Sequence, residues 1–189
     1  MATGAVLELF LIISNVGTAV VPFPILKRQN EAGALGYVTA RVIECVFIAI
    51  GIVSMLAILT VRQDAPSGTD AALGQGLEAV YEWAFRIGPG FIVGVGNRLI
   101  LGYLMYTSGL VPRGMAMLGL IGGPLVILAG ILVIYDVIEA SGPIQGLMTI
   151  PEGLWELSLG IYLVVKGFRP SPVLEEPPRV IQDRNVGVA

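Results

Sequence analysis

Long apolar runs separated by short polar segments dominate the sequence. Five of these runs contain few charges and approach the roughly 20 residues that an α-helix needs to cross a bilayer core about 30 Å thick. The pattern therefore predicts an all-α fold, a polytopic transmembrane bundle. Its five spanning helices are expected at about residues 3–26, 36–61, 89–108, 115–137 and 147–165.

A short amphipathic segment precedes the third run. Between residues 77 and 86, apolar side chains recur at helical spacing and the charged side chains fall on the opposite face. This pattern predicts a short interfacial helix that lies at the membrane surface and leads into the third span. The link 109–113 is very short, so spans three and four are expected to form an antiparallel hairpin.

The C-terminal segment differs in composition from the rest of the chain. Residues 170–189 are rich in proline and charge, which is typical of a flexible tail. We therefore expect residues 1–169 to form a single transmembrane domain and residues 170–189 to form a flexible cytoplasmic tail.

Composition strengthens the membrane interpretation and excludes several chemistries. The chain is 55% hydrophobic and 13% charged, with a mean hydropathy of +0.83, whereas soluble domains carry about a quarter charged residues. It has no histidine and one cysteine, which excludes histidine-based catalysis, an internal disulfide and a thiolate metal cluster. The net charge of −3 argues against nucleic acid as a partner.

The distribution of basic residues predicts the orientation. One set of flanks holds Lys27, Arg28, Arg113, Lys166 and Arg169, whereas the other holds Arg62 and Arg86 among several carboxylates. The positive-inside rule places the first set in the cytoplasm. We therefore expect a protein of the cell (inner, or cytoplasmic) membrane with its N-terminus outside and its C-terminus inside. Near the proposed outer boundary, where aromatic residues favour the interface, lie Trp83, Tyr135 and Trp155.

Three stretches together resemble a known membrane family. They are FPILKRQNEAGALGYVTARVIECV (23–46), GYLMYTSGLVPRGMAMLGLIG (102–122) and PEGLWELSLGIYLVVKGF (151–168). The chain resembles, from about residue 5 to 168, the bacterial family called domain of unknown function 4386. The resemblance implies a polytopic helical protein and brings no established activity or site. Family members usually carry a further hydrophobic helix at the N-terminus, and this sequence shows no counterpart of it. Either this sequence starts late, or this subgroup of the family lacks that helix.

Charged residues inside the spans are the candidates for function, because a charge in hydrocarbon costs at least ~2.5–3.5 kcal/mol on insertion scales. The candidate intramembrane polar cluster comprises Glu8, Asn15, Arg41, Glu44, Asn97, Arg98, Glu152 and Glu156. Tyr37, Arg41 and Glu44 share one helix face. They form either a local ion pair that orients the helix or a polar site open to the cytoplasm.

The later spans offer further pairings. Glu152 and Glu156 lie one helical turn apart, which suggests cation binding or acid–base chemistry. Alternatively, Glu152 lies near the outer water layer and Glu156 neutralises an arginine. Counted from the outer boundary, Arg98 and Glu156 fall at the same depth, about 14 Å. We therefore expect these two residues to pair if spans three and five are neighbours, with Glu44 and Glu8 as the rival partners of Arg98.

Glycines at regular spacing predict close helix packing on spans three and four. A glycine ridge on a membrane helix lets a neighbouring backbone approach. The candidate packing positions are Gly90, Gly94, Gly102, Gly119 and Gly123.

Three classes of function remain open. The first is a binding or transport protein that holds a small solute or ion at the buried charges. The second is an accessory or assembly subunit, in which those charges meet the helices of a homo-oligomer or of another membrane protein. The third, a lipid-modifying enzyme acting through Glu156 or Glu44, ranks last because no nucleophile, metal set or cofactor motif accompanies the carboxylates. We expect no catalytic residue and no cofactor, and the lipid bilayer is the expected partner.

Overall fold

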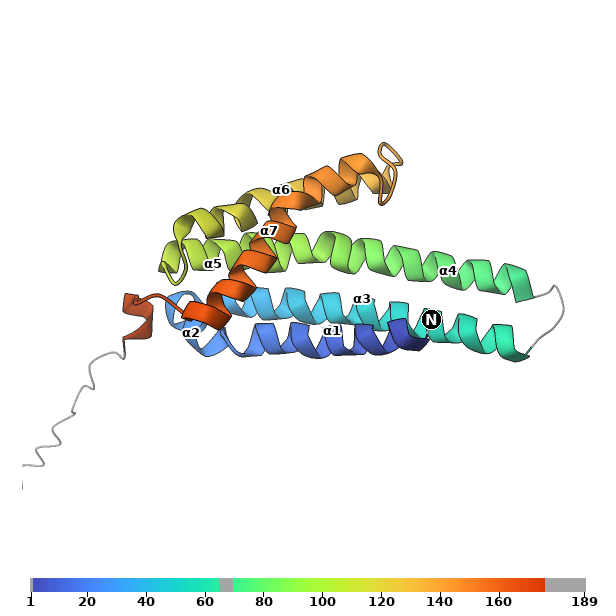
Figure 1. The fold of residues 1–189 in the computed structure, drawn as a ribbon, viewed down its shortest axis with the longest axis horizontal. Helices are drawn as coiled ribbons and strands as arrows, with labels where there is room; N and C mark the ends of the chain where they lie inside the picture. The colour runs from blue at the N-terminus through green and yellow to red at the C-terminus, as the bar shows by residue number, and fades with distance from the viewer. Residues whose placement is uncertain (1, 65–69, 176–189) are drawn as a thin grey trace, which may run out of the picture.

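The computed structural model describes residues 2–64 and 70–175, and nearly all of them are helical. Most elements run roughly along the long axis of the molecule, while α7 crosses the others obliquely (Figure 1). In chain order the elements are α1 (Ala2–Val20), α2 (Phe23–Gln29), α3 (Glu31–Asp64), α4 (Asp70–Ile87), the π-helices η1 (Gly88–Ile92) and η2 (Gly94–Ile100), α5 (Leu101–Ser108), α6 (Arg113–Ile134), α7 (Pro143–Lys166) and the 3-10 turn η3 (Pro172–Leu174).

Four helical segments of the described residues, rather than five, are long and apolar enough to cross a membrane. They are Ala2–Gln29, Glu31–Arg62, Ala72–Ser108 and Arg113–Ile134. The predicted fifth span corresponds to α7, a helix of 24 residues. Glu152 and Glu156 lie in the middle of this helix and lower its hydropathy, and its oblique path places it against the bundle rather than parallel to it (Figure 1).

The first apolar run, predicted as one helix over residues 3–26, is two helices. α1 ends at Val20, and α2 begins at Phe23 after Pro22, with Pro24 in its first turn. A proline has no backbone N–H to donate to the preceding turn. The helix therefore breaks at Val21–Pro22 and restarts, and α2 is a short segment at the end of the bundle.

The predicted interfacial helix is not a separate element. α4 continues through η1 and η2 into α5 as one rod that runs alongside α3 (Figure 1). Gly88 lies so close to α3 that an added Cβ would approach Phe47 Cβ to 2.5 Å. The segment 88–100 follows the wider π-helical path instead of breaking at Pro89, so the apolar face of α4 stays packed against α3.

The hairpin predicted between spans three and four is present. α5 ends at Ser108, and Gly109 adopts the left-handed conformation with φ of 68°, which costs a glycine little. Pro112 then precedes α6, which packs back against α5 and η2.

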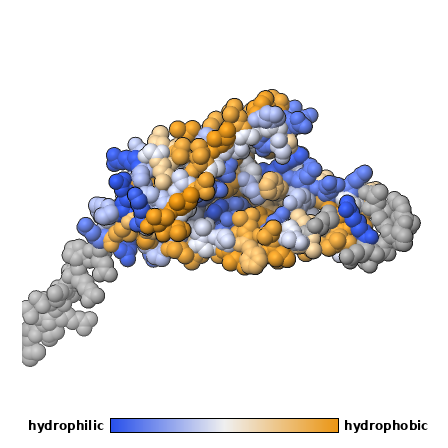
Figure 2. Space-filling view, viewed as in Figure 1, coloured by the Kyte–Doolittle hydropathy of each residue, from blue (hydrophilic) through white to orange (hydrophobic). Residues whose placement is uncertain are grey.

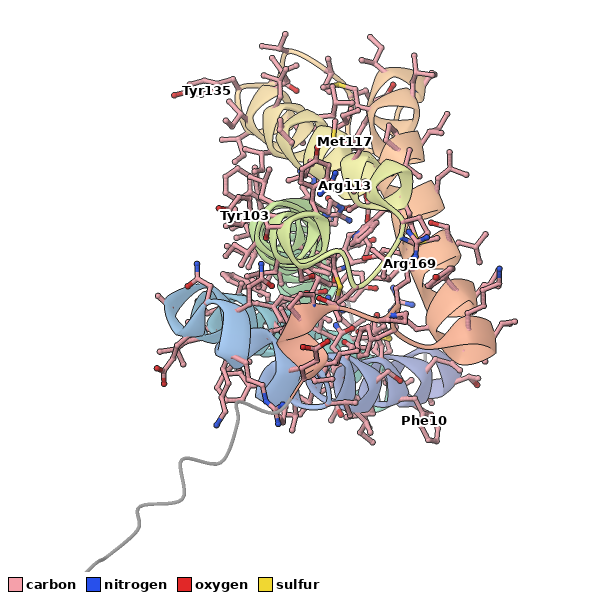
Figure 3. The ribbon with its side chains drawn as sticks, turned by 90° about the vertical axis from the view of Figure 1, so that its left-hand side faces the viewer. Phe10, Tyr103, Arg113, Met117, Tyr135 and Arg169 are labelled. Carbon is pink, nitrogen blue, oxygen red and sulfur yellow. The ribbon has the colours of Figure 1, made fainter. Side chains whose placement is uncertain are left out.

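Apolar side chains cover the outside of the bundle. Leu7, Phe10 and Val164 are 65%, 62% and 87% exposed, and Figure 3 shows Phe10 pointing away from α1. An apolar exterior of this extent suits lipid rather than water. Among the described residues, three cations lie over aromatic rings, in the pairs Lys27–Phe23, Arg86–Trp83 and Arg113–Tyr106.

The beginning of the expected flexible tail packs against the bundle. Ser171 is 8% exposed and donates a hydrogen bond to the Ser108 carbonyl at 2.6 Å. The Arg169 amide donates to the Leu110 carbonyl, and η3 follows. The first residues of the predicted tail thus contact the α5–α6 turn, and residues 176–189 lie outside the described part of the chain.

Candidate functional site

The interface between α1 and α3 holds the first half of a charged cluster. Arg41 Nη1 donates to Glu44 Oε2 at 2.7 Å, the ion pair that the spacing predicted. Asn15 Nδ2 donates to the other carboxylate oxygen of Glu44 at 3.1 Å, and Arg41 Nη2 donates to Thr18 Oγ1 at 3.2 Å. Arg41 and Glu44 are both buried. The pair therefore joins two helices in addition to orienting one.

The second half of the cluster lies between η2 and α7. Arg98 Nη2 contacts Glu152 Oε1, so the expected partner Glu156 is replaced by the carboxylate one turn earlier. Glu156 instead accepts a hydrogen bond from Asn97 Nδ2 at 2.5 Å. The ion pair with the fully buried Arg98 holds Glu152 against η2, and a position of Glu152 near the outer water layer stays a prediction.

Trp155 occupies a position that the sequence did not predict. It was expected at the membrane boundary, but it is fully buried, and its indole Nε1 donates to the Asn97 carbonyl at 3.0 Å. Gly119 of α6 makes room for the ring, since an added Cβ would lie 3.0 Å from Trp155 Cε2. Trp155 thereby fixes α7 to η2 between the two carboxylates.

The two halves form one electrostatic unit, which we call the charged cluster. Its members are Asn15, Arg41, Glu44, Asn97, Arg98, Glu152 and Glu156. Glu156 is close enough to interact electrostatically with both guanidinium groups, and Glu44 also acts on Arg98. Two guanidinium groups face three carboxylates, which leaves one negative charge in excess when all five are ionised.

The charged cluster is uneven in its exposure. Arg98 is 0% exposed, and its Nε and Nη1 have no hydrogen-bond partner among residues 2–64 and 70–175. Glu156 and Thr18 are exposed, although their neighbours Trp155 and Asn15 are buried. In Figure 2 a hydrophilic patch interrupts the apolar surface between α7 and the helices below it. The cluster is thus a largely buried polar group whose exposed carboxylate is Glu156.

Glu8 lies apart from the charged cluster. Its Oε1 accepts a hydrogen bond from Tyr81 of α4 at 2.9 Å. The sequence did not indicate this partner, because Tyr81 falls on the apolar face of the amphipathic segment 77–86. Seven residues separate Glu8 from Asn15 on α1, which corresponds to roughly 10 Å along the helix axis.

The candidate packing glycines lie at close approaches of the helices. A Cβ added at Gly102 would lie 3.3 Å from the α6 backbone. A Cβ added at Gly94 would lie 2.9 Å from Ile127 Cγ1, and one added at Gly123 would lie 2.8 Å from Leu99 Cγ. Gly90 instead faces the Phe85 carbonyl of its own rod at 3.4 Å. Because Gly94 and Gly123 have no side chains, α6 can pack closely against η2, which carries Asn97 and Arg98.

The arrangement offers ionic and hydrogen-bonding groups rather than a metal centre. Within the described ranges, no group of three or more Asp, Glu or Cys side chains is placed to hold a metal ion. Apolar helices of spanning length around a polar core define an integral membrane protein of the helical-bundle class. The chain belongs to the family described as a domain of unknown function (DUF4386), whose model matches residues 1–167. No curated protein and no solved structure matches the chain.

Proposed function

We propose that the protein binds a small ion or polar solute at the charged cluster, as a non-enzymatic protein of the transport type. The observation that supports this function is the exposed Glu156 beside two buried arginines, one buried carboxylate and the partly buried Glu152. An ionised carboxylate facing hydrocarbon is expensive. A solute or water at the opening removes that cost, and an occupied site is the simplest reason to keep the charge there.

The charge balance favours a monovalent cation, protons included, as the bound species. Arg41 is paired with Glu44 and Arg98 with Glu152, while Glu156 has only the neutral amide of Asn97 as its hydrogen-bond donor among the described residues. One added positive charge at Glu156 neutralises the cluster. Transport proteins place such groups near the middle of their helices, where irregular backbone lines the site, and η2 supplies irregular backbone here.

An assembly role is the second candidate, favoured by the surface of α7. Gly153, Glu156 and Gly160 share one helix face, and an added Cβ at either glycine would meet nothing within 4 Å among the described residues. Exposed small residues let a partner helix approach closely. In this alternative, a helix of another chain covers Glu156.

We expect ion-coupled charge movement that depends on Glu156. The purified protein in liposomes would be subjected to Na⁺, K⁺ and pH jumps on a solid-supported membrane, and the transient current recorded. Glu156→Gln should lower the current at least tenfold, because the excess charge disappears. Glu82→Gln, at an exposed carboxylate outside the cluster, is the matched control and should leave it unchanged.

Two results would count against this function. Wild-type protein that gives no current in any of the three jumps is one of them, and a Glu156→Gln current equal to that of wild type is the other. If Glu156→Gln instead changes the molecular mass of the particle in light scattering, the assembly role takes precedence.

We further propose that the end of the bundle carrying α2 and the α5–α6 turn is cytoplasmic. Lys27, Arg28, Arg113, Lys166 and Arg169 belong to this end, where Figure 1 also places the end of α7. In a Cys45→Ala background, an impermeant thiol reagent added from outside should label Tyr135→Cys and spare Glu175→Cys. Tyr135 is 76% exposed and Glu175 is also exposed. The reverse labelling pattern would invert the proposed orientation.

A further inference from the structure

Three exposed cations lie at the end of the bundle where the chain leaving α7 meets the α5–α6 turn. α6 begins at Arg113, α7 ends at Lys166, and Arg169 follows in the segment that leads to η3. All three side chains are exposed, and no ion pair among the described residues includes any of them. We call Arg113, Lys166 and Arg169 the basic patch. Its positive charge can therefore be neutralised by a partner from outside the described part of the chain.

Hydrogen bonds hold Arg169 beside the α5–α6 turn. Its backbone amide donates to the Leu110 carbonyl at 2.8 Å, and the buried Ser171 donates to the Ser108 carbonyl at 2.6 Å. Leu110 lies just before Arg113 in the chain, so the two arginines come from distant segments and meet at one turn. Figure 3 shows both at the end of the molecule that faces the viewer, between the α5–α6 turn and α7.

An exposed apolar face of α6 continues directly from the basic patch. Arg113, Met117 and Ile121 follow one another at intervals of one turn and share a helix face. Met117 and Ile121 are 40% and 49% exposed, and Figure 3 shows Met117 near Arg113 on α6. Arg113 is also the first residue of a spanning segment, Arg113–Ile134. The basic patch therefore lies at the depth where the hydrocarbon core gives way to the lipid headgroups.

The side chains of the basic patch suit a phosphate. Arg113 lies over the ring of Tyr106, and such stacking occupies the face of a guanidinium group and leaves the donors at its edge free. A guanidinium group binds phosphate oxygens through paired, charge-assisted hydrogen bonds. Basic sites at the ends of membrane helices recognise anionic headgroups in this way. A free phosphate would make the same polar contacts but would gain nothing from the apolar face of α6.

We propose that the basic patch binds the phosphate of an anionic phospholipid with one net negative charge, of the phosphatidylglycerol type. Arg113 and Arg169 bind the phosphate oxygens from two sides, and Lys166 adds a third positive charge. An acyl chain of the same lipid lies along Met117 and Ile121. The site is separate from the charged cluster, so it does not depend on the proposed binding of a cation there.

The test is a lipid titration of the full chain in maltoside detergent, read by native mass spectrometry. Dioleoylphosphatidylglycerol is the probe, and dioleoylphosphatidylcholine, with the same acyl chains and no net charge, is the comparison. We expect one phosphatidylglycerol to bind about tenfold more tightly than phosphatidylcholine. The double variant Arg113→Gln/Arg169→Gln should abolish this preference. Both side chains are exposed, and the melting temperature without lipid checks that the variant is folded.

Two further variants make the test specific. Lys27→Gln/Arg28→Gln removes the same charge from α2, at the same end of the bundle but outside the basic patch, and its affinity for phosphatidylglycerol should stay within about twofold of wild type. Arg169→Gln alone changes a residue outside the helices and should weaken binding about threefold. It keeps the test informative if the double variant of Arg113 and Arg169 does not fold.

Three outcomes would overturn the proposal. One is equal affinity of the wild-type protein for the two lipids, and another is a preference that survives the loss of Arg169. Equal losses from the α2 variant and from the double variant of the basic patch are the third, because they would indicate a general attraction to anionic surfaces. The source of the phosphate is tested separately: an excess of inorganic phosphate should leave the lipid bound, and displacement would assign the patch to a free anion instead.

Discussion

Replacing Arg98 with methionine is expected to lower the free energy of unfolding by about 3–5 kcal/mol, the range seen when one partner of a buried ion pair is removed. Arg98 is 0% exposed and contacts Glu152. Methionine fills part of the volume but leaves Glu152 beside η2 without its counterion. Reversible unfolding of the purified protein in mixed micelles, followed by circular dichroism, measures the loss.

A double-mutant cycle assigns the partner of Arg98. Arg98→Met combined with Glu152→Gln should cost less than the sum of the two single changes, with a coupling of about 1–3 kcal/mol. The cycle with Glu156→Gln is the comparison and should give a smaller coupling, because Glu156 acts on Arg98 without an ion-pair contact. Additive losses at Arg98 and Glu152 would contradict the pairing.

Replacing Gly123 with leucine is expected to disrupt the packing of α6 against η2. An added Cβ would meet Leu99 Cγ at 2.8 Å and the Gly94 carbonyl oxygen at 3.1 Å, and a backbone atom cannot move aside as a flexible side chain can. Overpacking of this kind costs about 1–3 kcal/mol or more. We therefore expect a lower melting temperature in detergent. We also expect weaker binding of the proposed cation at the charged cluster, because η2 carries Asn97 and Arg98.

Gly153→Leu provides the matched control for this substitution. It introduces the same side chain at a glycine of α7 where an added Cβ meets nothing within 4 Å among the described residues. Its effect on stability should stay within about 0.5 kcal/mol, as for other surface changes. Equal losses from both leucine variants would contradict this explanation, because leucine has a higher helix propensity than glycine at both sites and only Gly123 lies at a close approach.

Arg98 contacts Glu152 rather than the carboxylate expected at equal depth, Glu156, and helix geometry explains the difference. Counting residues from the membrane boundary assumes straight α-helices of equal tilt that rise 1.5 Å per residue. Arg98 lies in a π-helical stretch, which advances differently along its axis, and α7 crosses the bundle obliquely (Figure 1). Together these two departures from straight, parallel helices place Glu152 at Arg98 instead of Glu156, which lies one turn later on α7.

The sequence predicts contacts within one helix better than contacts between residues on different helices. The Arg41–Glu44 pair follows from its spacing on a single helix, and the structure contains it. The contacts of Glu44 with Asn15, Glu8 with Tyr81 and Trp155 with Asn97 span 29, 73 and 58 residues. Such contacts depend on which helices become neighbours and on their rotation, and no spacing within one helix encodes that information.

Hydrophobic patterning by itself determined the all-helical class, the approximate positions of the apolar helices, the α5–α6 hairpin and the set of charged residues that must avoid lipid. These features depend on local periodicity and on transfer from water, which each segment expresses alone. Tertiary structure alone decided that α4 runs on into η1 and η2, that α7 crosses the bundle, that Trp155 is buried, and that Glu8 bonds Tyr81 whereas Glu156 bonds Asn97. Those outcomes depend on the steric fit between helices, where glycines such as Gly88 and Gly119 set the approach of distant segments.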